Sequence, residues 1–367
     1  MRGLLWRVRA RRGLAMAAAG AALGVIASVA GLATSAGAVA REGVSPPRRS
    51  AGAATLPALV WSTPQSIDKR ALIAVKCPTA SFCVAIDKAG NILTAKAPLT
   101  RARDWRRSHL DSAITALACP SSALCVAVDS NGHVLTSRDP AGGAKTWSKA
   151  LIDSISPGEL SAVACRSDFC VAAGQGNAFV STNPTGGRRA WKSFLLPSNG
   201  DSPGIMSGFS CPLKSLCVGV DQSTGEGFLD DVYTSTDPGR SNKWNLTKEF
   251  TNNSFNGVAC PTKSLCVAPT AAGRVMATTK PTHGRAWHAT TLVPDVSINA
   301  VACSSAAFCV LGDSSGTIES STTPTAAKNA WLFQNVAPKD AIESLACPTS
   351  RLCIAVTHKG DAIVGRR

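Results

Sequence analysis

The fourteen cysteines of this 367-residue chain fall into seven close pairs that recur at an even interval. Cys77 opens the first pair and Cys347 opens the last, so 270 residues hold six intervals with a mean of 45. A regular period of that length is typical of repeat architectures and matches one four-stranded blade of a β-propeller. The pairs are Cys77/Cys83, Cys119/Cys125, Cys165/Cys170, Cys211/Cys217, Cys260/Cys266, Cys303/Cys309 and Cys347/Cys353. The spacing therefore predicts seven copies of one small structural unit.

Each copy carries the pattern of four short strands. In the second copy, alternating apolar residues at 114–119 predict a first strand, and residues 125–129 predict a second. The tight hairpin Ser-Asn-Gly at 130–132 leads into a third strand at 133–137, and residues 146–152 predict a fourth. A glycine, which supplies the positive φ that such a hairpin requires, recurs as Gly90, Gly132, Gly176, Gly227, Gly273, Gly316 and Gly360.

The tryptophans indicate that the array is a closed ring. One tryptophan opens the predicted fourth strand in each of the first six copies: Trp105, Trp147, Trp191, Trp244, Trp287 and Trp331. The seventh copy ends after its third strand at 361–365, whereas residues 58–63, with Trp61, form a strand that belongs to no copy. Pairing of that strand with the C-terminal blade would close the ring and leave no unpaired edge there. We predict an all-β, seven-bladed β-propeller over residues 57–367.

The cysteine pairs predict one disulfide within each blade. Their members lie on the first and second strands and face one another across a short turn. Metal binding is the competing interpretation, but zinc sites use four ligands with C-x2–4-C spacing, and each pair here stands alone. The five histidines occupy unrelated positions: His109, His133, His283, His288 and His358. We therefore expect seven disulfides, no metal and no cofactor.

Residues 1–40 have the pattern of a secretory signal peptide. A basic stretch precedes the uncharged residues 14–40, which end in Ala-Val-Ala just before Arg41. The basic residues are Arg2, Arg7, Arg9, Arg11 and Arg12. The uncharged run is also long enough to cross a bilayer, so a retained membrane anchor is the alternative, but its alanine and glycine content favours cleavage. We expect a secreted, extracellular protein, anchored to the cell envelope only if the leader is retained, with residues 41–56 as a flexible linker.

The formal net charge of +15 does not indicate a nucleic-acid ligand, because five of the positive charges lie in the leader. The densest basic group in the repeats is Arg101, Arg103, Arg106 and Arg107, which we interpret as a solvated outer strand. Nucleic-acid binding depends on a clustered basic stripe. The rest of the chain has no such stripe, and we expect no nucleic-acid partner.

Two segments, 119–147 and 211–244, resemble repeats of secreted bacterial β-propellers with an Asp-box-like turn, of the sialidase and photosystem assembly factor types. The resemblance covers residues 58–367 and rests on the pattern S-x-D-x-G-x-x-W. Asp139 and Asp237 keep the acid of that pattern, and other copies have Asn183, Lys280 and Thr323 in its place. The turn is structural in that family, so the resemblance implies a propeller fold and no particular activity.

Sialidase-like catalysis is the enzymatic activity that this resemblance raises. By resemblance it needs three arginines around a carboxylate, a tyrosine with a glutamate partner and an acidic proton donor. The chain has one tyrosine, Tyr233, with Glu226, Asp230 and Asp231 near it in sequence. Tyr233 falls in a predicted third strand, away from the central face where that family's catalytic residues gather, which favours a packing role. We assign no catalytic residue, and keep a secreted carbohydrate-active hydrolase or lyase acting from the central face as the second hypothesis.

A ligand surface is expected on the face that carries the second-to-third-strand loops. The longest loops of that face surround the fourth copy, at 197–204, 222–227 and 249–254, and loops carry binding function more often than strands do. The candidate ligand-binding residues are Asp201, Gln222, Glu226, Asn252 and Asn253; ordinary solvated loops are the alternative. We predict a monomeric, non-catalytic extracellular binding or scaffold propeller whose ligand is a protein or a polysaccharide.

Overall fold

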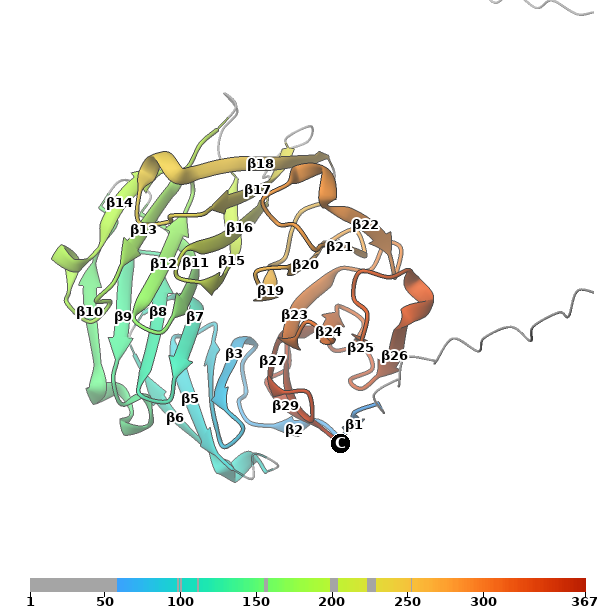
Figure 1. Cartoon of the computed structure of the whole chain (residues 1–367). Helices are drawn as coiled ribbons and strands as arrows, with labels where there is room; N and C mark the ends of the chain where they lie inside the picture. The colour runs from blue at the N-terminus through green and yellow to red at the C-terminus, as the bar shows by residue number, and fades with distance from the viewer. Residues whose placement is uncertain are drawn as a thin grey trace, which may run out of the picture. The chain divides into compact units, whose positions relative to one another are not determined.

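The computed structural model describes residues 58–97, 99, 101–110, 112–154, 158–198, 204–222, 229–251 and 253–367. The predicted signal peptide and linker, residues 1–40 and 41–56, lie outside the described residues, so both stay predictions. Within the described part, the chain forms seven antiparallel sheets arranged as a ring, which Figure 1 views along its axis. The predicted seven-bladed, all-β propeller is confirmed.

Each blade consists of four strands that follow one another in sequence. Blade 1 contains β3 (Leu72–Thr79), β4 (Phe82–Asp87), β5 (Asn91–Lys96) and β6 (Trp105–His109); blade 2 contains β7 (Ile114–Ser121), β8 (Leu124–Asp129), β9 (His133–Ser137) and β10 (Trp147–Leu151). Blade 3 contains β11 (Leu160–Arg166), β12 (Phe169–Gly174), β13 (Asn177–Ser181) and β14 (Lys192–Leu195); blade 4 contains β15 (Ile205–Leu213), β16 (Leu216–Gln222), β17 (Leu229–Ser235) and β18 (Trp244–Thr251). Blade 5 contains β19 (Ala259–Thr262), β20 (Leu265–Pro269), β21 (Arg274–Thr278) and β22 (His288–Thr291); blade 6 contains β23 (Ile298–Ser305), β24 (Phe308–Asp313), β25 (Thr317–Ser321) and β26 (Trp331–Asn335).

Blade 7 takes its strands from both ends of the described chain. It contains β27 (Ile342–Thr349), β28 (Leu352–Thr357) and β29 (Asp361–Arg366), and β1 (Val60–Trp61) and β2 (Gln65–Ser66) both pair with β29. The register places Trp61 opposite Gly365, where the indole ring lies only 2.9 Å from the position that a Cβ would occupy. The closure predicted from the position of Trp61 is therefore confirmed.

The helices of the described residues are single 3-10 turns between third and fourth strands. They are η1 (Ala102–Asp104), η2 (Pro140–Gly142), η3 (Ala144–Thr146), η4 (Arg188–Ala190), η5 (Ser241–Lys243), η6 (Gly284–Ala286) and η7 (Lys328–Ala330). No helix in the described part of the chain is long and apolar enough to span a membrane.

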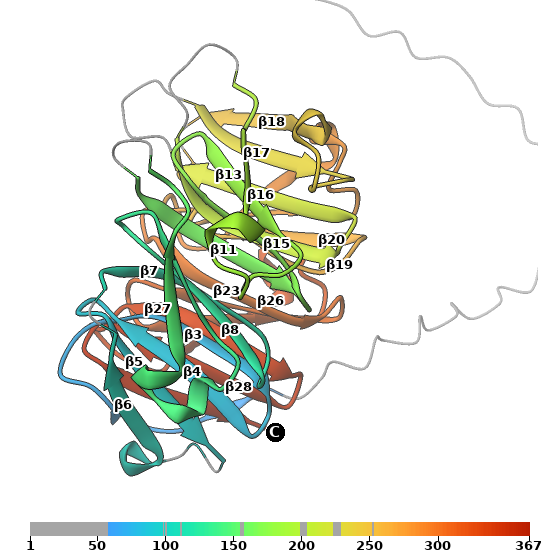
Figure 2. The ribbon, with the colours of Figure 1, turned by 90° about the vertical axis from the view of Figure 1, so that its left-hand side faces the viewer.

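The hydrophobic core is divided into seven clusters, each between two neighbouring blades. One cluster joins Leu72 and Val75 of β3 to Ile354 of β28, and the next joins Val84 of β4 to Leu117 of β7. Because each blade is covered on both faces, its second strand is buried along almost its whole length, which explains the continuous apolar runs of these strands. First strands of adjacent blades lie side by side around the centre, as β11 and β15 do in Figures 1 and 2.

All seven predicted disulfides are present, and each joins the first and second strands of one blade. The Cα–Cα distance is 4.1 Å in every one. The bonds are Cys77–Cys83, Cys119–Cys125, Cys165–Cys170, Cys211–Cys217, Cys260–Cys266, Cys303–Cys309 and Cys347–Cys353. The predicted pairing is therefore confirmed in every blade.

The two ends of each cystine have different surroundings. The cysteine on the second strand has no exposed surface and belongs to one of the clusters between blades; these residues are Cys83, Cys125, Cys170, Cys217, Cys266, Cys309 and Cys353. The first-strand cysteine lies nearer the centre of the ring and is partly exposed in several blades, for example Cys77 and Cys119. Each disulfide thus ties the inner strand of a blade to the packed core.

The shorter C-x4-C spacing of blade 3 has a structural reason. In blade 2 the register shifts between Ala118 and Ser121, whereas in blade 3 Cys165 pairs directly with Cys170 and Arg166 with Phe169. The extra residue of the longer hairpin is thus a β-bulge that blade 3 lacks.

Six of the seven predicted hairpin glycines have a positive φ: Gly90, Gly132, Gly176, Gly273, Gly316 and Gly360. Gly227 lies outside the described residues. At Gly132 a Cβ would come within 2.2 Å of the Asp153 carbonyl oxygen, so a side chain is excluded by space as well as by conformation.

Candidate functional site in the central channel

Polar side chains of the first strands link neighbouring blades around the centre of the ring. Thr115 of β7 donates to the carbonyl of Leu160 at 2.5 Å, and Ser161 of β11 donates to the carbonyl of Met206 at 2.7 Å. Asn256, just before β19, donates to the carbonyl of Ile298 at 3.0 Å. These polar groups line the channel, and their hydrogen bonds join neighbouring blades.

Two cavities follow one another along the channel. We call the side of the ring with second-to-third-strand turns such as 129–133 the turn face, and the side with cystine-bridged hairpins such as 119–125 the disulfide face. The turn-face cavity has a volume of about 180 Å³ and the disulfide-face cavity about 400 Å³. Their walls are mainly small or apolar residues, and Lys76 lines both cavities.

The cysteines contribute to these walls from one end of each bond only. The first-strand cysteines of blades 2 to 6 line the disulfide-face cavity: Cys119, Cys165, Cys211, Cys260 and Cys303. Their partners on the second strands lie outside the described lining of both cavities, as do the second-strand cysteines of blades 1 and 7; these residues are Cys83, Cys125, Cys170, Cys217, Cys266, Cys309 and Cys353. The second-strand cysteines of blades 2 to 6 are buried disulfide partners of these lining residues, as the cysteine spacing predicts.

Lys76 is a partly buried cation without an ionic partner. Burial lowers the pKa of its ammonium group below the ordinary value. In the part of the chain that the structure describes, no ion pair or side-chain hydrogen bond involves this ammonium. Arg166 is the second cation of the disulfide-face cavity, and it is exposed.

Glu343 is the one carboxylate among the described residues that line the two cavities. Its Oε1 lies 2.8 Å from Nδ1 of His358, and its side chain is 25% exposed. Glycoside hydrolysis by the usual two-carboxylate mechanism needs a second acid on the opposite side of the substrate. The described lining therefore holds a single acid where that mechanism needs two.

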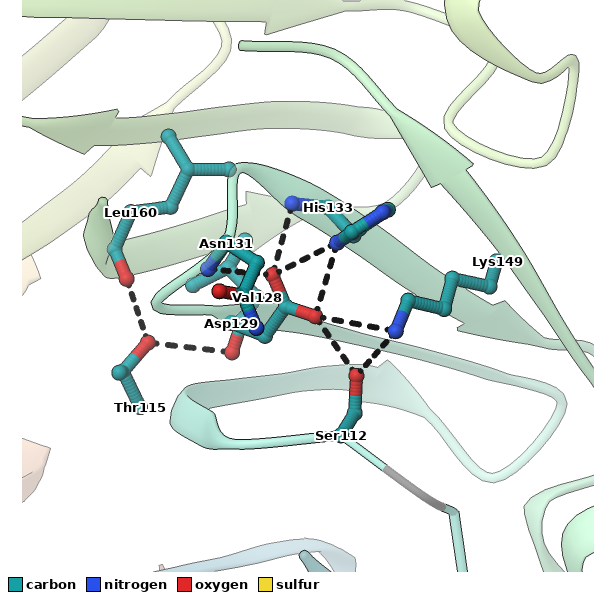
Figure 3. A network of polar contacts seen from close by, with 8 residues as sticks. All are labelled: Ser112, Thr115, Val128, Asp129, Asn131, His133, Lys149 and Leu160. Carbon is teal, nitrogen blue, oxygen red and sulfur yellow. Dashed lines mark hydrogen bonds and ion pairs between the residues drawn. The ribbon is translucent and has the colours of Figure 1, made fainter. Parts of the chain in front are cut away.

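Aspartates at the ends of second strands hold the tight turns of the turn face. Asp129 accepts from the backbone N–H groups of Asn131 at 3.0 Å and His133 at 2.8 Å, and from the Ser112 hydroxyl at 2.6 Å (Figure 3). The Lys149 ammonium adds an ion pair at 3.4 Å. Burial opposes ionisation, but these hydrogen bonds and the charge of His133 outweigh it and hold the pKa of Asp129 below its usual value.

Blade 4 places an aspartate at the same point, Asp221, in a different setting. Asp221 accepts from the backbone N–H of Asp231 at 2.6 Å and from the Tyr233 hydroxyl at 3.2 Å. Burial, with repulsion from Asp231 and Asp230, raises the pKa of Asp221 to about 7.

Two of the five predicted ligand-binding residues are described, and both are engaged in contacts within the fold. Gln222 at the end of β16 donates to Oδ1 of Asn256 at 2.7 Å. The buried Asn253 donates its backbone N–H to Asp230 at 2.8 Å and its side-chain amide to the carbonyl of Thr251. The other three predicted residues, Asp201, Glu226 and Asn252, lie outside the described residues.

Tyr233 is buried in the core between blades 3 and 4, with an exposed fraction of 1%, and packs with Phe209 and Trp244. Its hydroxyl donates to Asp221 and to Asp231, and burial raises its pKa above the ordinary value. This position agrees with the predicted packing role.

The turn of the Asp-box-like pattern does not depend on its acid, although Asp237 forms an ion pair with Arg240 at 3.2 Å within the blade 4 turn. A hydroxyl on the third strand accepts the backbone N–H two residues on, as Ser137 does from Asp139 and Thr278 does from Lys280. Asp139 itself is exposed. The hydroxyl recurs where the acid is replaced, which accounts for the variation at that position.

Sequence reasoning missed Lys76 and Arg166, although a comparison of the copies with one another contains the evidence. Directly before the first cysteine, the other six blades have Ala118, Ala164, Ser210, Ala259, Ala302 and Ala346 where blade 1 has Lys76. By strand register, blade 3 has Arg166 where the other six blades have the uncharged residues Thr79, Ser121, Leu213, Thr262, Ser305 and Thr349. Both cations are thus exceptions to the repeat.

Comparison with known proteins supports the fold. No protein-family model matches the chain, and the search of curated proteins finds no match. Among solved structures, the chain is similar to YCF48 bound to D1 peptide, with 12% sequence identity, a TM-score of 0.65, and coverage of 85% of this chain and 99% of that one. It is also similar to YCF48 from Cyanidioschyzon merolae, with 12% identity, a TM-score of 0.62, and coverage of 83% and 98%. At this identity the likeness shows a shared propeller fold.

Proposed function

We propose that this chain is a non-catalytic binding propeller whose ligand is a segment of another protein, and that it works in an oxidising, extracellular compartment. The observation that carries the proposal is the channel lining, which has one carboxylate, Glu343, among its described residues. Convergent acids would favour the hydrolase hypothesis, whereas small and apolar walls favour a scaffold. Seven disulfides support the compartment, because disulfides persist in oxidising environments.

A protein ligand is favoured over a polysaccharide by the burial of the aromatic residues. Tryptophan and tyrosine rings offer broad apolar faces to a ligand only when they are exposed. Every described tryptophan is buried or partly buried, and so is Tyr233. The similar structure of YCF48 was solved with a peptide bound, which is consistent with a propeller of this form taking a peptide.

We propose that the ligand surface lies on the turn face at blade 4 and uses the predicted residues Asp201, Gln222, Glu226, Asn252 and Asn253. Blade 4 departs from the repeat: β18 has 8 residues, whereas the fourth strands of blades 1, 2, 3, 5 and 6 have 4 or 5. Its second and third strands are joined by residues 223–228, whereas residues 130–132 suffice in blade 2. Longer connections on a rigid frame are typical binding elements.

The test is a screen of the full chain against a displayed peptide library and a glycan array. We expect enriched peptides and no glycan binding. A variant in which residues 223–228 are replaced by the blade 2 turn 130–132 should lose the peptides, while a control with the 314–316 turn of blade 6 exchanged in the same way should keep them. Glycan binding, glycan cleavage or full peptide binding by the blade 4 variant would contradict the proposal.

A further inference from the structure

The disulfide-face cavity has the size and the walls of a small-ligand site. Its volume of about 400 Å³ lies in the range of ligand pockets. Cystine sulfurs and proline rings form much of the wall: Cys119, Cys165, Cys211, Cys260, Cys303, Pro120, Pro212 and Pro261. These groups are apolar, and disulfides keep them in place, so the cavity is preformed.

The charge in this cavity has one sign. Lys76 and Arg166 both line it, and no carboxylate is among its described lining residues. Lys76 also borders the turn-face cavity and therefore lies deep in the channel, whereas Arg166 is exposed at the rim. Arg166 is held there by the tight hairpin of blade 3, in which Ser167 has a φ of 55°.

Neither cation is paired with an acid among the described residues. The nearest acid in sequence to Arg166 is Asp168, which instead pairs with Lys214 at 2.5 Å. Glu343, on the blade next to that of Lys76, contacts His358. A partly buried ammonium without a counter-ion is unfavourable, and an anion that reaches it from solvent gains a charge-assisted hydrogen bond.

The fold itself does not require these two cations. Alanine stands at the position of Lys76 in five other blades. Ser121 and Ser305 pair with Leu124 and Phe308 as Arg166 pairs with Phe169, so the position of Arg166 accepts a small hydroxyl. The five alanines are Ala118, Ala164, Ala259, Ala302 and Ala346. A residue that departs from its own repeat at a cavity, without an internal partner, indicates a role outside the fold.

We propose that the disulfide-face cavity binds one anionic group, a carboxylate or a phosphate, with Lys76 contacting it inside the channel and Arg166 from the rim. A guanidinium matches both anions in a two-pronged geometry, whereas the ammonium acts as a point charge, so the pair does not discriminate by charge alone. This site is on the opposite face from the blade 4 surface, and it stands or fails independently of the proposed protein ligand.

The experiment titrates the full chain with inorganic phosphate and, separately, with butyrate, and follows binding by calorimetry. A second readout is the rate at which an amine-reactive ester modifies Lys76, measured by peptide mass spectrometry with and without each anion. We expect binding of at least one anion and slower modification of Lys76 when it is bound. The anion that protects Lys76 identifies which of the two chemistries the site takes.

The variants K76A and K76M should each weaken binding about tenfold or more, and R166S should weaken it by about threefold to tenfold. The matched control is K263A, because Lys263 is an exposed residue of the same face that does not line the cavity. It should bind as the unaltered chain does. Equal affinity of K76A and the unaltered chain, or no binding of either anion up to about 50 mM, would overturn the proposal.

Discussion

Blades 2 and 4 each have a buried aspartate at the equivalent position near the end of the second strand, yet the pKa values of the two carboxyl groups shift in opposite directions. Asp129 is surrounded by donors, including a lysine ammonium, and its pKa lies below the usual value. Asp221 has two donors and two neighbouring acids, and its pKa rises to about 7. The same residue at the same site of the repeat is thus stabilising or costly according to the number of donors that face it.

The largest expected effect is the loss of Asp129. D129A should lower the free energy of unfolding by about 4 kcal/mol, because it removes the acceptor of the Ser112 hydroxyl and of the backbone N–H groups of Asn131 and His133. Chemical denaturation at pH 7 measures this change. D139A, which alters an exposed aspartate of the same blade, should change stability by less than about 0.5 kcal/mol. Equal effects of the two variants would refute the role assigned to Asp129.

Glu319 of β25 extends the comparison to blade 6. It is fully buried, and burial, with the charge of Asp313 and a hydrogen bond to it, raises the pKa of Glu319 to about 9. Because the folded-state pKa is raised, stability falls as the pH rises from about 4.5 toward 9, where the folded state binds the extra proton.

Replacing Glu319 should therefore stabilise the protein at neutral and alkaline pH. E319L should gain on the order of 3 kcal/mol at pH 8 and nothing at pH 4. Leucine stands at the equivalent position in blades 1 and 2, as Leu93 and Leu135. Thermal unfolding curves across this pH range measure the gain, and a gain that is the same at both pH values would contradict the electrostatic cause.

D221N tests the other side of the comparison. Asp221 has a raised folded-state pKa, so its unfavourable contribution grows as the pH rises from about 4 to about 7 and is constant above that. D221N should remove this slope and stabilise the chain by about 2 kcal/mol at pH 8. Asp129 has a lowered pKa, so its contribution is present above about pH 4 and is lost as the pH falls further. If D221N were less stable than the unaltered chain at pH 8, Asp221 would be stabilising, as Asp129 is, and the contrast between blades 2 and 4 would be wrong.

The smallest expected effect belongs to Tyr233. Y233F removes one donor from Asp221 and should cost about 1 kcal/mol. Because the Tyr233 hydroxyl lowers the pKa of Asp221, that pKa should rise further in Y233F, which carboxyl-carbon NMR titration measures. Phe179 occupies the equivalent place in blade 3, so the ring itself should be accommodated. An unchanged Asp221 titration would show that the hydroxyl has no effect on this carboxyl.

The fold could be predicted from the sequence because its determinants are local and repeated. Each cystine spans a sequence separation of 5 or 6, the described hairpin turns have their glycines, and the displaced Trp61 indicated closure. The channel could not be predicted, because the residues that meet there come from seven distant segments. The role of Lys76 can be inferred only when the residues that line the channel with it are known. The contrast between Asp129 and Asp221 likewise depends on donors such as Ser112 that belong to the adjoining connection.

The closure of blade 7 has a consequence for the order in which the protein can fold. Each cystine links residues that leave the ribosome almost together, whereas Val60 must wait for Arg366 before its strand has a partner. During synthesis the early blades can therefore oxidise and pack pairwise while the first strand remains an open edge, available to other chains. A chain that loses β29 would consist of stapled blades with exposed edges at both ends. The 6 residues of β29 thus cover the strand edges through which the blades could otherwise associate with other chains.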